Sequence, residues 1–73
     1  MAKEISEVCA GKLREIRRKR GLTLQGFEAL SNGSVKAVVL GSYERGTRAV
    51  SLERLEHIAG LYEVPIQYFL GIS

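Results

Sequence analysis

Apolar side chains recur at spacings of three and four in the first part of the chain. In residues 5–19 these side chains are Ile5, Val8, Cys9, Leu13 and Ile16. On an α-helix this spacing places them along one face, which can be buried against other elements. Gly21 follows, and glycine favours the left-handed conformation that ends many helices. Residues 5–19 are therefore predicted to form an amphipathic helix.

Similar signals predict four further helices. Thr23 and Ser51 are suited to cap helix N-termini, the Asn-Gly pair within residues 31–34 predicts a turn, and Pro65 is tolerated in the first turn of a helix. With the first, the predicted helices cover residues 5–19, 24–30, 36–45, 52–62 and 65–70. No segment alternates between apolar and polar residues as a strand would. The sequence thus predicts an all-α fold, in which residues 1–73 form a single domain of five short helices around one core.

Each predicted helix contributes apolar residues to that core. The inward residues expected in the second and fourth helices are Leu24, Phe27, Leu30, Leu52, Leu55, Ile58, Ala59 and Tyr62. Cys9 belongs to the apolar face of the first helix, so a packing role is expected for its thiol. His57 projects away from the apolar face of its helix and is expected to be an ordinary surface histidine.

The composition argues against several classes of function. With one cysteine, one histidine and no aspartate among 73 residues, the chain offers neither a metal-ligand cluster nor a nucleophile paired with a base. We therefore expect no enzymatic activity, no metal and no cofactor. A single cysteine excludes an internal disulfide and agrees with a reducing cytoplasm. No stretch approaches the length of a membrane span, and the acidic N-terminus does not resemble a signal peptide.

Positive charge is concentrated in two segments, and the formal net charge is +3. Residues 12–20 (KLREIRRKR) hold six cationic side chains, and residues 36–54 add Lys36, Arg45, Arg48 and Arg54. Clustering of this kind suggests an anionic polymer or surface as partner, although a single basic run is more often a solvated helix face. A membrane surface is disfavoured because the helix over residues 5–19 needs its apolar side for the core.

The predicted helix over residues 36–45 has two different faces. At 100° per residue, Leu40 and Tyr43 lie on the side expected to face the core. The opposite side carries Val38, Ser42 and Arg45. This outward set suits the major groove of DNA, because valine can meet thymine methyl groups, serine can bond base edges or phosphate, and arginine can reach phosphate or guanine.

Two residues of the same helix raise structural questions. Gly41 has two interpretations that stay equally open, close approach to DNA and close packing on another helix. Glu44 falls on the inward side, where an unpaired carboxylate is costly. Arg17, at the edge of the apolar face of residues 5–19, is the natural partner because a guanidinium binds a carboxylate bidentately and stays charged. We therefore predict an Arg17–Glu44 ion pair that fixes the third helix on the first.

Three strings of residues occur in an order and spacing typical of a known family: LREIRRKRGLT (13–23), YERGTR (43–48) and SLERLEHIAGLYEVP (51–65). They resemble the Cro/repressor-type helix-turn-helix domains, also called the xenobiotic-response-element class. The resemblance implies a lambda-repressor-like fold. It also implies sequence-specific binding of double-stranded DNA, with the third helix in the major groove and the second across the backbone.

The resemblance further implies which residues contact DNA. Base contacts are implied for Lys36, Ala37, Val38, Gly41 and Ser42, and backbone contacts for Val39, Arg45 and Arg48. The second helix is expected to contact phosphate through Thr23, Gln25 or its backbone amides, although Leu24 stands where most of the family has glutamine. Arg17 and Glu44 match a buried ion pair that is common in the family.

Within the family, KAVVLGSYERGTRAV (36–50) and the preceding SNGS turn resemble a branch of developmental regulators from filamentous actinobacteria. That resemblance implies a cytoplasmic, nucleoid-associated repressor that binds pseudo-palindromic promoter sites as a dimer. It also implies a separate C-terminal domain for cyclic di-GMP, which these residues do not include, so no small-molecule ligand is expected in this segment. The alternative is a protein-interaction module of the same fold, such as an antitoxin-like adaptor, in which Val38 and Val39 would form a hydrophobic contact.

Overall fold

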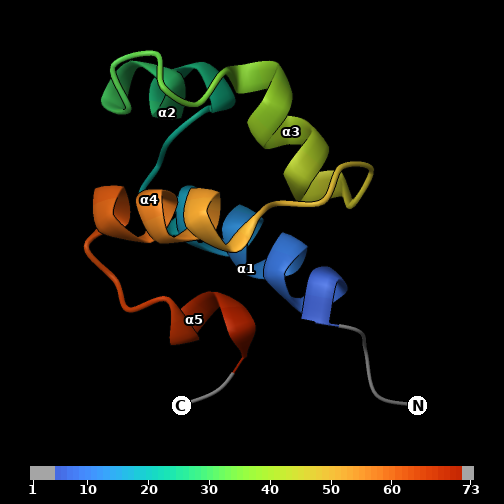
Figure 1. Ribbon diagram of the computed structural model, residues 1–73. Coiled ribbons are helices and arrows are strands. Elements are labelled where there is room, and N and C mark those ends of the chain that lie inside the picture. The colour runs from blue at the N-terminus through green and yellow to red at the C-terminus, as the bar shows by residue number, and fades with distance from the viewer. Residues whose placement is uncertain (1–4, 72–73) are drawn as a thin grey trace.

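The computed structural model describes residues 5–71, and every regular element in that range is a helix. The helices are α1 (Ile5–Lys19), α2 (Leu24–Leu30), α3 (Ala37–Arg45), α4 (Leu52–Tyr62) and α5 (Gln67–Leu70). In Figure 1, α2 and α3 lie together at the top, α1 and α4 cross the middle, and α5 lies at the bottom. Packing of α1 against both α3 and α5, and of α2 against α3, joins these layers. The predicted all-α class with five helices is confirmed.

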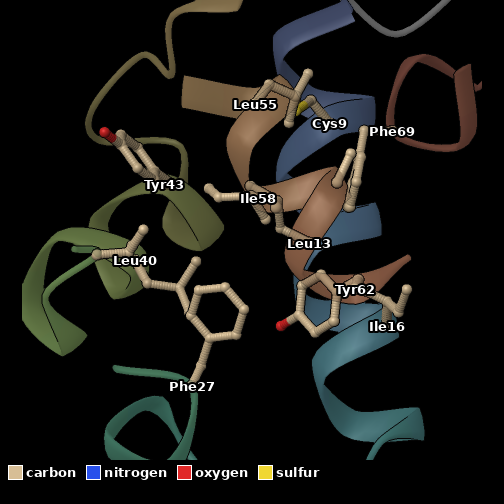
Figure 2. Close-up of a cluster of buried hydrophobic side chains, with 12 residues drawn as sticks. Cys9, Leu13, Ile16, Phe27, Leu40, Tyr43, Leu55, Ile58, Tyr62 and Phe69 are labelled. Carbon is tan, nitrogen blue, oxygen red and sulfur yellow. The ribbon is translucent and has the colours of Figure 1, made fainter. Parts of the chain in front are cut away.

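One cluster of buried side chains holds the helices together. Figure 2 shows α1 contributing Leu13 and Ile16, α4 contributing Ile58 and Tyr62, and α2 contributing Phe27 beside Tyr62. The rings of Phe27 and Tyr62 lie 4.8 Å apart at their centroids, a spacing typical of attractive aromatic pairs. The same cluster also contains Cys9, Val35, Leu40, Tyr43, Leu55, Ala59 and Phe69. Because every helix supplies at least one of these side chains, none can be displaced without opening the core.

Two helices begin later than the sequence predicts. Residue Lys36 is extended, with φ −72° and ψ 145°, so α3 starts at Ala37 and not at residue 36. The last helix was expected over residues 65–70 but covers Gln67–Leu70. Ahead of it, hydrogen bonds run from Tyr68 N–H to the Pro65 oxygen and from Phe69 N–H to the Ile66 oxygen. These bonds join residues three apart, so Pro65 opens a tight 3₁₀-type turn before the α-helix.

Three apolar residues expected to face inward are exposed. Leu30 ends α2 and Leu52 begins α4, and Leu52 is 67% exposed. Ile5 is similarly exposed at the first residue of α1. All three expectations are wrong for the same reason. The helices cross over a core that is shorter than they are, so the ends of the apolar faces project beyond it.

The turn between α2 and α3 sets where α3 begins. Asn32 and Gly33 both have positive φ, at 56° and 78°, as the Asn-Gly signal predicts. Ser31 is buried at the centre of the turn, where its hydroxyl accepts a hydrogen bond from Val35 N–H at 3.1 Å and donates to the Glu28 oxygen at 2.8 Å. This buried hydroxyl fixes the turn within the six residues, 31–36, that separate the two helices.

A bidentate ion pair fixes α3 on α1. Arg17 Nε donates to Glu44 Oε2 at 2.7 Å and Arg17 Nη2 donates to Glu44 Oε1 at 2.9 Å. A third bond runs from Arg17 Nη1 to the Leu22 oxygen at 2.8 Å, which ties in the α1–α2 connection. The Glu44 side chain is only 4% exposed. Hydrogen bonding to Glu44 raises the pKa of Arg17, so the guanidinium stays charged.

Replacing Arg17 with alanine should lower the free energy of unfolding by about 3 kcal/mol, because the Glu44 carboxylate would be left buried without its partner. Arg17→Lys should not restore this stability, since an ammonium cannot form the two parallel bonds to the carboxylate and a third to Leu22. Urea unfolding followed by circular dichroism measures both changes. Arg18→Ala, at the exposed neighbouring position, is the control and should change stability by less than about 0.5 kcal/mol. A neutral Arg17→Ala would contradict the role of the pair.

Tyr62 should make stability depend on pH in alkaline solution. Its hydroxyl is buried, and no partner for it lies among residues 5–71. Burial, helped by the nearby Glu44 carboxylate, raises the pKa of the Tyr62 phenol to about 12. The unfolded chain has a phenol pKa of about 10. The folded state therefore keeps its proton more tightly, and stability is complete below the unfolded pKa and is lost as pH rises through the folded pKa.

Tyr62→Phe should consequently be close to neutral or slightly stabilising at about pH 8, because it removes a polar group without a partner. At about pH 11 it should be clearly more stable than the parent chain, since it cannot ionise. Chemical unfolding at both pH values measures the difference between the two proteins, which cancels the contribution of the other tyrosines. An equal loss of stability in both proteins would contradict this assignment.

Candidate nucleic-acid interface

The helix pair α2–α3 presents its outer side to solvent. Thr23 caps α2, and its Oγ1 accepts a hydrogen bond from Gly26 N–H at 2.9 Å. Phe27 then points into the core from α2, while Leu40 and Tyr43 do so from α3. Both helices are thus held by side chains that enter the core. The remaining residues of α2 and α3 form the surface on the side away from the core.

The outward side of α3 carries the side chains that helical phase predicts. Val38 is 75% exposed, Arg45 is exposed and Ser42 is half-buried. Ser42 is already engaged, because its hydroxyl donates to the Val38 oxygen at 3.1 Å and lies 3.4 Å from Arg45 Nη2. A serine in this arrangement can still offer lone pairs to a ligand, while the Arg45 guanidinium lies along the helix beside it.

Gly41 is buried in the free protein. This favours close packing on another helix over close approach to DNA as the reason for a glycine at this position. A methyl group placed on Gly41 would lie 3.1 Å from Arg45 Nη1 and 3.3 Å from Leu24 Cδ1. Both distances are shorter than ordinary van der Waals contacts. The absence of a side chain on Gly41 therefore lets Leu24 of α2 pack closely against α3, and lets the Arg45 guanidinium lie directly against the helix backbone. Val39 also differs from its expected place, because it is half-buried and packs against the core cluster.

An open depression of about 560 Å³ lies between α2 and α3. Its walls are formed by Leu24, Gln25, Glu28, Lys36, Ala37, Val38, Gly41 and Arg45. Most residues assigned to DNA contact from the sequence are therefore brought together on one surface. Thr23 lies at the start of α2 and Ser42 on the outward side of α3, whereas Arg48 follows α3 and borders a different hollow near the start of α4. That second hollow is mainly apolar and contains no other predicted contact residue.

Glu28 is a residue of this surface that sequence reasoning missed. Its Oε1 accepts a hydrogen bond from Ala37 N–H at 2.7 Å, across the turn from α2 to α3. A signal for it was present in the sequence, because Lys36 precedes α3 and lysine cannot cap a helix N-terminus. Any side-chain cap for α3 therefore has to come from elsewhere in the chain.

Much of the basic run at residues 12–20 is used within the protein. Arg17 binds Glu44. Arg20 donates a hydrogen bond to the backbone oxygen of Tyr62 at 3.0 Å, and its guanidinium lies over the Tyr62 ring. Lys12 and Lys19 both pair with Glu15, and the hydrogen bond to Lys19 is the main cause that lowers the pKa of that carboxyl. The cations of this run therefore act largely within the fold, and the site depends more on those near α3.

The C-terminal end of the turn is linked to α4. Ser34 Oγ lies 2.8 Å from His57 Nε2, and Arg54 Nη1 donates to the Ser34 oxygen at 2.8 Å. His57 is exposed, as expected, but it is engaged in a contact. These bonds support the turn that precedes α3 from the side of α4.

Among residues 5–71 no group of three or more His, Cys, Asp or Glu side chains is placed to hold a metal ion. Over the same range, no helix combines the length and apolar character needed to cross a bilayer.

Comparisons with known proteins agree with this geometry. Residues 13–69 match a family model described as helix-turn-helix. Two solved structures are similar over most of the chain, and each shares 49% sequence identity with it. One, the BldD DNA-binding domain from S. venezulae, has a TM-score of 0.84 and covers 92% of this chain and 97% of its own. The other, a crystal structure of the DNA-binding domain of BldD, has a TM-score of 0.85, with 94% and 97% covered. A comparison with curated protein sequences gave no match.

Proposed function

The chain belongs to the Cro/C1-type helix-turn-helix family, and from this premise we propose that it binds double-stranded DNA sequence-specifically as part of a non-enzymatic transcription regulator. The observation that carries the proposal is the outward face of α3. It exposes Val38 and Arg45 beside the depression shared with α2, while Leu40 and Tyr43 anchor the helix from behind. A helix that packs against the core on one side and exposes a narrow face on the other can enter the major groove.

In this proposal α3 lies in the major groove and α2 crosses the phosphate backbone. Base edges are read by the exposed part of α3, for which we propose Lys36, Ala37, Val38 and Ser42. Gly41 is buried under Leu24 and Arg45 in the free protein, so it serves the reading surface chiefly by letting α2 and α3 pack closely. Backbone contacts are proposed for Thr23, Gln25, Arg45 and Arg48, with Val39 supporting the helix from its half-buried position.

The reading surface has few long polar side chains. Val38 and Ala37 can contact thymine methyl groups, but neither can form a hydrogen bond to a base edge through its side chain. We therefore propose that apolar contacts and the shape of the DNA contribute more to specificity than bidentate hydrogen bonds do. Phosphate contacts by the cations at the rim position the domain and supply most of its salt-dependent affinity.

A regulator built on this domain is proposed to act as a repressor at pseudo-palindromic promoter sites. The similarity to the DNA-binding domain of BldD supports the DNA binding that this role requires. Two copies on inverted half-sites about one helical turn apart would double the contacts. Exposed Gln67 on α5 offers one contact between copies, whereas Tyr68 is half-buried against Phe69 with Lys12 over its ring.

The alternative is an adaptor that binds another protein through the same face, and the exposed Val38 is the observation in its favour. The nearby cations Lys36 and Arg45 favour DNA instead. Fluorescence anisotropy with labelled mixed genomic fragments, at low and physiological salt, separates the two functions. DNA binding predicts association that weakens steeply with salt, and selection of bound fragments should then yield a defined motif. Absence of association at low salt would contradict the proposal.

Backbone and base contacts should respond differently to mutation. Arg45→Ala should weaken binding to the selected motif and to random DNA alike, and should reduce the salt slope by about one from an initial value of roughly −4 to −5 per subunit. Val38→Ala should instead cost roughly 1 kcal/mol on the selected motif and little on random DNA, because it removes methyl contacts. Arg14→Ala, an exposed cation of α1 away from the depression, is the charge control. Equal effects of the Arg45 and Val38 changes on both kinds of DNA would contradict this division.

The isolated domain should be monomeric in free solution and pair on DNA. Sedimentation velocity on the free protein should give one species at the monomer mass, and on a duplex with two inverted half-sites it should give a two-to-one complex. Binding to the second half-site should be favoured when spacing is one helical turn and lost when half a turn is inserted, because the copies then lie on opposite faces of the duplex. A tight dimer without DNA would contradict this expectation.

A further inference from the structure

The amino end of α3 has no capping side chain of its own. Lys36 holds the N-cap position and forms no side-chain hydrogen bond there. The first N–H groups of a helix have no partner within the helix, and the helix dipole gives that end a partial positive charge. In this protein the exposed amino end of α3 lies on the surface proposed to meet DNA, so its partner influences how α3 approaches a groove.

Glu28 supplies that partner from α2. Its Oε1 accepts the Ala37 N–H at 2.7 Å, which is a short, charge-assisted bond. Its backbone oxygen is also engaged, because it accepts from Gly33 N–H at 2.9 Å and from the Ser31 hydroxyl at 2.8 Å. Glu28 is therefore joined through its main chain to the turn and through its side chain to the helix that follows it. No other carboxylate in residues 5–71 is seen to cap α3.

The position of this carboxylate has a consequence for DNA binding. The N-terminus of a helix is a ready site for a phosphate, and here Glu28 occupies it in the wall of the depression. A DNA phosphate is thereby kept away from the amino end of α3. The amino end of the helix, with Lys36 beside it, is left to face base edges.

We propose that Glu28 is a positioning residue for DNA recognition, which holds the amino end of α3 in register on α2 and prevents a backbone phosphate from taking that end. This inference rests on the proposed function. It assigns to Glu28 an effect on specificity, that is, on the ratio of affinities for the selected motif and for random DNA, beyond any effect on folding.

Two substitutions separate the hydrogen bond from the charge. Glu28→Gln keeps an oxygen that can accept the Ala37 N–H but removes the negative charge. Glu28→Ala removes both. Glu56→Gln is the matched control, because Glu56 is exposed on α4 and its side chain is not part of the depression. Affinities of each variant are measured by anisotropy for the selected duplex and for a random duplex of equal length at the same salt.

Glu28→Ala should lower the specificity ratio by about fivefold, the size of effect that the loss of one helix cap produces if it weakens only the specific complex. Its affinity for random DNA should rise, because phosphate can then reach α3. Glu28→Gln should bind both duplexes more tightly than the parent but keep the ratio within about twofold. Glu56→Gln should leave the ratio unchanged. Loss of affinity for both duplexes by the same factor in Glu28→Ala, or an equal fall of the ratio in Glu28→Gln, would overturn the proposal.

A measurement on the free protein tests the cap independently of DNA. The Ala37 amide should be protected from hydrogen exchange and shifted downfield in the NMR spectrum of the parent and of Glu28→Gln, and should lose both properties in Glu28→Ala. An Ala37 amide that is unaffected by Glu28→Ala would overturn the positioning role. If the parent chain does not discriminate between the two duplexes, the proposed function fails, whereas this amide still reports whether Glu28 holds α3.

Discussion

The pair formed by Arg17 and Glu44 is the contact on which the arrangement of the helices depends. It joins α1 to α3 through two short bonds and adds a third to the connection before α2. A buried ion pair contributes little net stability compared with apolar packing, but it penalises any arrangement that leaves one partner alone. The pair thus selects one orientation of α3 over others of similar hydrophobic burial. The placement of the outer face of α3 follows from that orientation.

Charge in this protein divides into cations that build the fold and cations that face outward. Arg17 and Arg20 are engaged with buried or partly buried groups, and Lys12 and Lys19 share Glu15. A count of basic residues therefore exaggerates what α1 can offer to a polyanion. Near α3 the cations are fewer, but Lys36 and Arg45 border a concave surface, where the Glu28 carboxylate is engaged with the Ala37 N–H.

The sequence predicts the parts of this structure that depend on local pattern. Spacing of apolar residues and capping residues predicts the five helices, and the cost of burying Glu44 predicts its pairing with Arg17. Other features depend on how the helices meet. Leu30 and Leu52 have inward phase but lie beyond the end of the core. The burial of Gly41 under Leu24, and the bond from Glu28 to Ala37, require two helices to be placed relative to each other, which periodicity within one helix does not provide. The contacts to DNA assigned from the sequence stay predictions.

The packing of the Arg45 guanidinium against α3 at Gly41 has a thermodynamic consequence. An arginine that extends into water samples many rotamers and loses them when it grips a phosphate, at a cost of about 0.5–1.5 kcal/mol for an immobilised long side chain. Here the guanidinium already lies across its own helix within 3.4 Å of Ser42. Part of that entropy is given up during folding, so association with a polyanion is accompanied by a smaller loss of side-chain disorder than an unrestrained arginine would suffer.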